Sequence, residues 1–165
     1  FNVLKNVQAA NVFYIPENLL FQLNNKWPEA KIFHFSTALI ESLGSHYKYK
    51  FDDNMLFLNV RDDSFDLIYF KNKKLFFYNL FKFRTKEDFI YFLLLTMEQL
   101  SLNPEEVQLL VSGKIDLKME IYTILYTYIR NIRFNGRNDS LSYSDCLNEA
   151  GSHRDYVLFN ALQCE

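Results

Sequence analysis

Glycine is scarce in this sequence. A turn that cradles phosphate groups depends on glycine, because backbone amides have to approach the phosphate closely and a side chain would block them. The 165 residues contain only Gly44, Gly113, Gly136 and Gly151. This scarcity argues against a glycine-rich nucleotide cradle.

The sequence also has few cysteines, a small net charge and no long apolar run. Cys146 and Cys164 are too few and too far apart for a metal motif or a disulfide framework, so we expect a reducing compartment, the cytoplasm. The net charge is -2 with acids and bases interspersed, which predicts no surface for nucleic acid or anionic lipid. The longest apolar run, around residues 89–97, falls short of the roughly 20 residues that a membrane span needs.

Apolar material for a core is abundant. Hydrophobic residues make up 49% of the chain and aromatic residues 18%, and the length fits one domain, or one domain plus a piece of another. The chain starts at Phe1 with no signal-peptide pattern.

Three apolar runs at residues 55–60, 65–70 and 75–83 are separated by two short polar turns. Their Val, Ile, Phe and Tyr content predicts a three-stranded antiparallel meander. Asn72 tolerates the positive φ that the second turn needs. The third run is apolar on both faces, so both faces require a cover, from this chain or from a partner.

A helix, strand, helix and strand are predicted after the meander. Thr85 and Asp88 form a capping-box pattern for a helix over residues 86–100. A strand at 107–111, a helix from an Asp116 cap to about 130 and a strand at 131–134 follow. We expect a polar loop over 135–152 and a closing helix over 154–163.

This order indicates an α/β protein of the ribonuclease-H-like class, in which an antiparallel meander is extended by parallel strands and helices cover both faces. Residues 11–44 predict strands at 11–15 and 31–35, a helix at 17–26 and a helix from an N-cap at Ser36 to residue 43, closed by Gly44. The polar segment 45–54 is the candidate boundary between subdomains 1–46 and 47–165.

The sequence resembles a known family through its apolar patterns: Asn11-Val-Phe-Tyr-Ile-Pro16, Phe33-His-Phe-Ser-Thr-Ala-Leu-Ile40, Leu56-Phe-Leu-Asn-Val60, Phe65-Asp-Leu-Ile-Tyr-Phe70 and Leu158-Phe-Asn-Ala-Leu-Gln-Cys-Glu165. It is similar to an uncharacterised bacterial family, mainly from Bacteroidetes, with an actin-like ATPase fold, and more distantly to pilus-assembly actin-like proteins. The resemblance implies that residues 1–46 end a first subdomain and that 47–165 form the second. It also implies that the first phosphate-binding hairpin lies upstream of Phe1 or is absent.

Actin-like ATPases carry an Asp-x-Gly phosphate turn at the end of the first meander strand, with a Thr nearby. The matching positions here are Asn59, Val60 and Arg61, with Ser64 near the Thr position. An amide replaces the acid that orients Mg²⁺, and a bulky cation replaces the glycine. This pattern indicates a degenerate turn, although Arg61 can still meet an anion.

The adenosine-binding turn of that fold commonly shows Gly-Gly. Here Ser112 and Gly113 are followed by Lys114, so one glycine is kept. A turn that needs one flexible residue explains this segment more simply than a ligand site does. The candidate nucleotide-binding residues, all in degenerate turns, are Asn59, Arg61, Ser64, Ser112, Gly113 and Lys114.

Nucleases of ribonuclease-H-like fold hold two metals with carboxylates, the first on the first meander strand. Asn59 stands there instead, and Asp62, Asp63 and Asp66 cluster at the following turn. Such a cluster is more typical of a solvated hairpin tip. His34 lies in an apolar segment and is predicted to be a hydrogen-bonded core residue.

We therefore predict a non-catalytic actin-like-fold interaction or scaffold module in the bacterial cytoplasm. We assign it no catalytic residue, metal or cofactor, and expect a protein partner or self-association rather than nucleic acid. The alternative is a divergent ATP-binding protein that uses Mg-ATP through Ser112 and Gly113. The third hypothesis is a metal-dependent nuclease that uses Asp62, Asp63 and Asp66.

Overall fold

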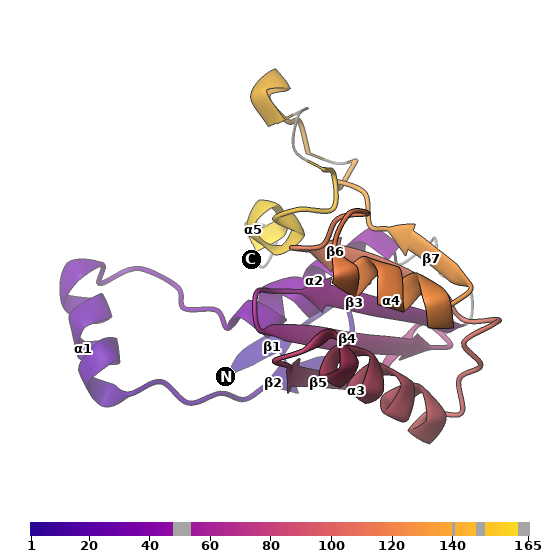
Figure 1. The fold of residues 1–165 in the computed structure, drawn as a ribbon. Coiled ribbons are helices and arrows are strands. Elements are labelled where there is room, and N and C mark those ends of the chain that lie inside the picture. Colours follow the sequence, from indigo (N-terminus) through magenta and orange to yellow (C-terminus); the bar gives the residue numbers. More distant parts are fainter. Residues whose placement is uncertain (48–53, 140, 148–150, 162–165) are drawn as a thin grey trace.

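A mixed five-stranded sheet forms the centre of the computed structural model, which describes residues 1–47, 54–139, 141–147 and 151–161 (Figure 1). The strand order is β5-β4-β3-β6-β7, and β3–β4 and β4–β5 pair antiparallel while β3–β6 and β6–β7 pair parallel. This confirms the predicted meander and its parallel extension. The strands are β3 (Asn54–Val60), β4 (Ser64–Lys71), β5 (Lys74–Lys82), β6 (Gln108–Gly113) and β7 (Asn131–Phe134).

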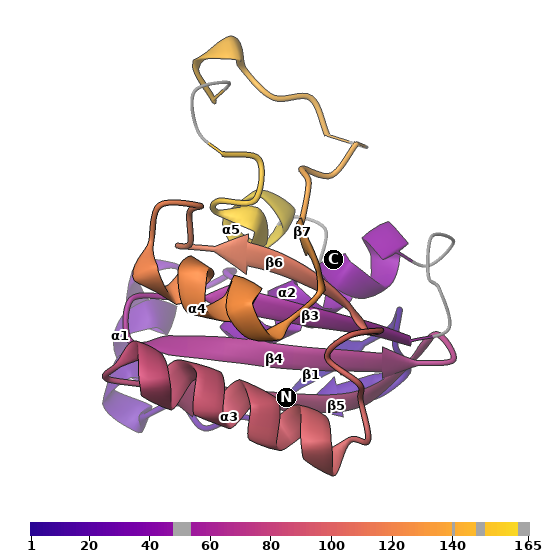
Figure 2. The same ribbon diagram turned by 45° about the vertical axis from the view of Figure 1, so that its right-hand side comes forward.

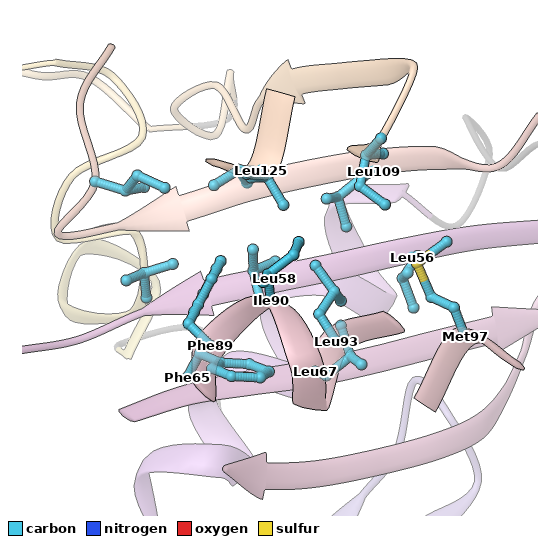
Figure 3. Packing of buried hydrophobic residues seen from close by; sticks show 14 of the residues in the cluster. Leu56, Leu58, Phe65, Leu67, Phe89, Ile90, Leu93, Met97, Leu109 and Leu125 are labelled. Atoms are coloured by element: carbon cyan, nitrogen blue, oxygen red, sulfur yellow. The ribbon is translucent and has the colours of Figure 1, made fainter. Parts of the chain in front are cut away.

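Two helices, α3 (Lys86–Gln99) and α4 (Glu120–Tyr128), cover one face of the sheet (Figure 2). Side chains of α3 pack onto alternate residues of β3 and β4, because successive side chains of a strand point to opposite faces. Figure 3 shows this layer, which includes Leu56, Leu58, Phe65, Leu67, Phe89 and Leu93. The predicted capping box is present: Thr85 accepts from the Asp88 amide, and the Asp88 carboxylate accepts from the Thr85 amide.

The opposite face is covered by α2 (Phe35–Tyr47), α5 (Tyr156–Asn160) and a hairpin of β1 (Asn2–Leu4) and β2 (Ala9–Asn11). Leu4 and Leu39 share a buried cluster with Met55 and Phe57 of β3. Residues 48–53 of the candidate boundary lie outside the described residues. The division into subdomains 1–46 and 47–165 stays a prediction.

Helix α1 (Glu17–Lys26) agrees with its predicted bounds but stands away from the sheet, at the end of two extended limbs (Figure 1). We call residues 12–33 the arm. The strands predicted at 11–15 and 31–35 are wrong, since β2 ends at Asn11 and residues 12–16 and 28–34 form no strand. Alternating apolar residues favour an extended backbone, but a strand also requires a neighbouring strand with which to exchange hydrogen bonds.

Helix α2 is longer than predicted. It starts at Phe35, so Ser36 lies inside the first turn, and Gly44 is helical rather than a C-terminal stop. Gly44 packs on the β1–β2 hairpin, where a Cβ atom would lie 2.8 Å from Cγ1 of Val7. Glu41 accepts hydrogen bonds from the backbone and side-chain amides of Asn6 and holds the same hairpin.

The second half of the chain departs from prediction mainly at element ends. Ser112 and Gly113 belong to β6, and α4 begins at Glu120 after Met119 rather than after a cap at Asp116. Helix α5 covers part of the predicted closing helix, of which residues 162 and 163 lie outside the described residues. A short 3-10 helix, Asp145–Leu147, lies in the predicted polar loop. Of the helices in the described segments, none has the length and apolar character required to cross a membrane.

Candidate functional site

The candidate site lies where β3 and β6 end side by side. The two strands are parallel, and Asn59 pairs with Ser112 and Val60 with Gly113. Ligands of open α/β sheets commonly bind outside the carboxyl ends of the parallel strands. A cavity of about 510 Å³ opens at this edge. Of the six candidate residues, Asn59, Arg61, Gly113 and Lys114 line the cavity, whereas Ser64 and Ser112 are buried beside it.

Asp66 of β4 is the buried charge of this region, with 0% of its surface exposed. It accepts hydrogen bonds from Nδ2 of Asn59 (3.2 Å), Nη2 of Arg61 (3.2 Å) and the Tyr78 hydroxyl (2.9 Å). A buried carboxylate is tolerated when it is paired with a cation and its oxygens are hydrogen-bonded. Two of the candidate nucleotide-binding side chains therefore have an internal partner.

The pKa of Tyr78 is shifted by this buried, negatively charged environment. Burial, followed by the negative charge of Asp66 and the hydrogen bond to it, raises the pKa of Tyr78 to about 12. The phenol is therefore neutral at physiological pH and acts as a donor to the carboxylate.

Asn59 uses both ends of its side-chain amide. Its Nδ2 donates to Asp66, and its Oδ1 accepts from Oγ of Ser112 at 3.2 Å. A carboxylate at this position would have no proton to donate to Asp66. Position 59 therefore requires an amide here, where the Asp-x-Gly pattern has an acid.

Four backbone amides of the two turns are hydrogen-bonded within the protein. A phosphate-binding turn needs such amides free, because they are the donors that approach the phosphate oxygens. The four pairs are Arg61 N to Ser64 O (2.8 Å), Gly113 N to His153 O (2.9 Å), Lys114 N to Val60 O (2.8 Å) and Ile115 N to Gly113 O (3.0 Å).

Gly113 has a structural reason to be glycine. Its φ is +91°, and a Cβ atom would lie 2.1 Å from the carbonyl oxygen of Val60 on the neighbouring strand. L-residues with a side chain rarely adopt this φ, and the contact would be a severe clash. The packing of β6 on β3 therefore accounts for the one glycine that the adenosine-turn pattern retains.

The segment before α5 packs against the turn that follows β6. His153 is buried, and its ring lies 4.2 Å from that of Phe134, centroid to centroid. Nε2 of His153 lies 2.6 Å from the carbonyl oxygen of Ile115, to which it donates. Arg154 forms an ion pair with Asp116. These contacts fix the carbonyl oxygen of His153 that accepts from Gly113.

Comparison with known proteins assigns the chain to a family. Residues 1–132 match the family described as protein of unknown function (DUF3822). The chain belongs to this family. A crystal structure of a Bacteroides thetaiotaomicron protein with actin-like ATPase fold and unknown function matches with a TM-score of 0.78 and 26% identity. The match covers 99% of this chain and 58% of that one, so this DUF3822 chain spans less than two thirds of the relative's length. No curated protein matches the sequence significantly.

The actin-like fold predicted for this DUF3822 chain is thus confirmed, whereas the role of the six candidate residues stays a prediction. The three acids of the nuclease hypothesis do not converge: Asp62 is exposed and pairs with Lys114 at 2.7 Å, and Asp63 accepts from Oγ of Ser64. Asp66 points into the protein, so its assignment to a solvated tip is wrong. In the described part of the chain, no three His, Cys, Asp or Glu side chains are placed to hold a metal ion.

Several residues of the site were not predicted from the sequence. They come from α2, from the N-cap and first turn of α4 and from α5, which the topology brings to one edge of the sheet. Nothing in their local sequence signals this meeting. They are Phe35, Met119, Ile121, Tyr156, Val157 and Leu158. His34, predicted to be a hydrogen-bonded core residue in a strand, is exposed at the base of the arm, so its predicted place in the core and in a strand is wrong. The predicted hydrogen bonding is present, since its Nδ1 lies 2.7 Å from Oγ of Ser36.

Proposed function

We propose that this chain is a non-catalytic interaction module with an actin-like fold, and that it binds a protein domain through the arm. One observation carries the proposal: no residue of α1 is buried, although the arm is rich in apolar side chains. The exposed apolar residues of the arm are Val12, Tyr14, Leu19, Leu20, Phe21, Trp27 and Phe33. Exposed apolar side chains concentrated in one segment are typical of a contact site.

The arm is anchored where it leaves the domain. Nδ2 of Asn2 donates to the Ile32 carbonyl oxygen (3.0 Å), and Oδ1 of Asn2 accepts from the His34 amide (3.0 Å). The rings of Phe13 and His34 lie 5.3 Å apart and hold the two limbs together. These contacts hold the base of the arm in place before a partner binds, which lowers the entropy cost of binding.

Helix α1 also needs a partner for its own stability. Isolated helices shorter than about 12–15 residues are marginal in water. Helix α1 has 10 residues, and neither of its caps has a side-chain hydrogen bond. Burial of its apolar side chains against another protein would supply the missing stabilisation.

The relative with known structure supports the choice of partner. It matches 99% of this chain but has a further part without counterpart here, since only 58% of its length is covered. We infer that the arm docks on a domain of the kind that forms that further part. The proposal places the module in the bacterial cytoplasm, which agrees with the bacterial source of the relative and with two widely spaced cysteines.

Internal hydrogen bonds in the turns after β3 and β6 support a non-catalytic role. The amides of Arg61, Gly113 and Lys114 are bonded internally, and Asp66 holds the side chains of Asn59 and Arg61. A nucleotide would have to displace these bonds to find donors for its phosphates. The geometry therefore favours an interaction module over an ATP-binding protein.

Site-specific photo-crosslinking in cells tests the arm directly. A p-benzoylphenylalanine replaces Phe21 of α1, which is 67% exposed, and a matched control replaces Tyr91 of α3, which is 59% exposed. We expect position 21 alone to yield an adduct whose partner peptides come from a domain similar to the unmatched part of the relative. Adducts to a second copy of this chain or to its own sheet, or equal yields at both positions, would overturn the proposal.

A further inference from the structure

We propose that the cavity at the ends of β3 and β6 binds an uncharged, largely apolar small molecule through one carbonyl oxygen, which accepts a hydrogen bond from Arg61. This site goes beyond the protein interaction proposed for the arm and does not depend on it. Its ligand class differs from the nucleotides that glycine-rich turns bind.

The size and lining of the cavity fit such a ligand. Small-molecule sites are typically concave, roughly 300–1,000 Å³ in volume, and mostly apolar with a few polar groups that fix orientation. This cavity measures about 510 Å³. Its apolar wall is formed by Phe35, Val60, Met119, Ile121, Val157 and Leu158.

Arg61 is held in place but has donors left for a ligand. The Cζ atom lies 4.8 Å from the centroid of the Phe35 ring, and Nη2 bonds to Asp66 at 3.2 Å. The Nε atom is buried without a hydrogen-bond partner among the described residues. The side chain remains 34% exposed, and its Nη1 amino group makes no hydrogen bond to the described residues. A fixed guanidinium with unused donors suits a carbonyl acceptor.

The charges around the cavity argue for an uncharged ligand. Each cation at the rim has an acidic partner: Arg61 pairs with Asp66, Lys114 with Asp62 and Arg154 with Asp116. An anionic ligand would place a second negative charge beside these carboxylates. A neutral carbonyl adds a hydrogen bond to Arg61 without competing with Asp66 for its charge.

Three naphthalene probes of nearly equal size separate the possibilities. They are 2-acetylnaphthalene, which has a carbonyl, 2-ethylnaphthalene, which lacks an acceptor, and 2-naphthoate, which is charged. We expect NMR titration of the whole chain to show shifts at Val60, Met119 and Val157 with 2-acetylnaphthalene, and about tenfold weaker binding of 2-ethylnaphthalene. Tighter binding of 2-naphthoate, or no shift at these residues with any probe, would overturn the proposal.

Two variants test which residues of the cavity contact the probes. Arg61→Lys keeps a positive charge beside Asp66 but replaces the guanidinium, which has a second amino group for the ligand, with one ammonium group that also bonds to Asp66. We therefore expect a smaller preference for the acetyl probe over the ethyl probe, with a thermal midpoint close to that of the parent. Met119 lines the cavity and is 42% exposed, so Met119→Trp adds a large side chain to the cavity wall and is expected to abolish binding of all three probes. An unchanged preference for the acetyl probe in Arg61→Lys, or unchanged binding in Met119→Trp, would contradict the assigned site.

Discussion

Asn59 and Asp66 face each other directly across β3 and β4, and the side-chain amide of Asn59 donates to the Asp66 carboxylate at 3.2 Å. This pair links the turn after β3 to the core of the protein. The Asp66 carboxylate is buried and needs a donor at position 59, which an aspartate there would not supply. The amide at position 59 and the buried carboxylate of Asp66 are therefore one structural feature.

Asn59→Asp is predicted to destabilise the protein by about 3 kcal/mol, because it places two buried carboxylates against each other. Asp66→Asn is predicted to cost about 2 kcal/mol, because Arg61 loses its partner. In the double variant the amide and the carboxylate exchange places and their hydrogen bond is restored. We expect urea denaturation to show that the double variant is more stable than Asn59→Asp alone.

Asp62→Asn is the control for these variants. It removes the exposed ion pair with Lys114, and surface pairs contribute up to about 1 kcal/mol. If Asp62→Asn lowers the free energy of unfolding as much as Asp66→Asn does, the assigned role of Asp66 is contradicted. If the double variant loses as much unfolding free energy as Asn59→Asp and Asp66→Asn together, the proposed pairing of Asn59 and Asp66 is contradicted.

Gly113→Ala is predicted to destabilise the protein by about 2 kcal/mol or more, because φ is +91° and the added Cβ meets the Val60 carbonyl oxygen. Gly136→Ala is the matched control, since a Cβ atom there has nothing within 4 Å, and we expect a change within about 0.5 kcal/mol. Thermal and urea denaturation of both variants measure the difference. Equal stability of the two variants would show that the β6 turn does not require glycine.

The stability of the protein is predicted to fall as the pH rises from 10 to 12. The pKa of Tyr78 is raised from 10.0 to about 12, so the folded protein keeps a proton that the unfolded chain has lost in this range. The contribution of Tyr78 to stability is full below pH 10 and declines as the pH approaches 12. Burial raises the pKa of Tyr47 to about 12 as well, so this residue adds to the same decline.

Tyr78→Phe isolates one part of this pH dependence. It removes a titrating group and one donor to Asp66, so we expect a loss of about 1 kcal/mol at pH 8 and a shallower decline between pH 10 and 11.5. Guanidinium denaturation at a series of pH values measures both effects. An unchanged slope in Tyr78→Phe would contradict the position of the Tyr78 hydroxyl beside Asp66.

The order of elements could be predicted from the sequence because local signals mark it. Apolar runs separated by short polar turns predict a meander, and Asn72, where φ is +49°, supports the second turn. The capping box of Thr85 and Asp88 marks the start of α3 correctly. The start of α4 was misplaced because Asp116 is a typical capping residue, whereas it pairs with Arg154 in the structure.

The arm could not be predicted, because a strand depends on a partner that a local pattern does not reveal. Residues 12–15 and 31–34 have apolar residues typical of strands, yet they pair with no strand in the described part of the chain. The burial of Asp66 was missed for a related reason. Three nearby acids suggest a solvated tip, and only the register of β4 on β3 shows that Asp66 points inward toward Asn59.

NMR titration of isotope-labelled protein with Mg-ATP tests the central claim most directly. The account predicts that the backbone amide resonances of Arg61, Gly113, Lys114 and Ile115 stay in place up to millimolar nucleotide, because these amides are hydrogen-bonded to Ser64, His153, Val60 and Gly113. Saturable shifts of these amides with a dissociation constant in the micromolar range would contradict it. They would show that the turns open to accept phosphate.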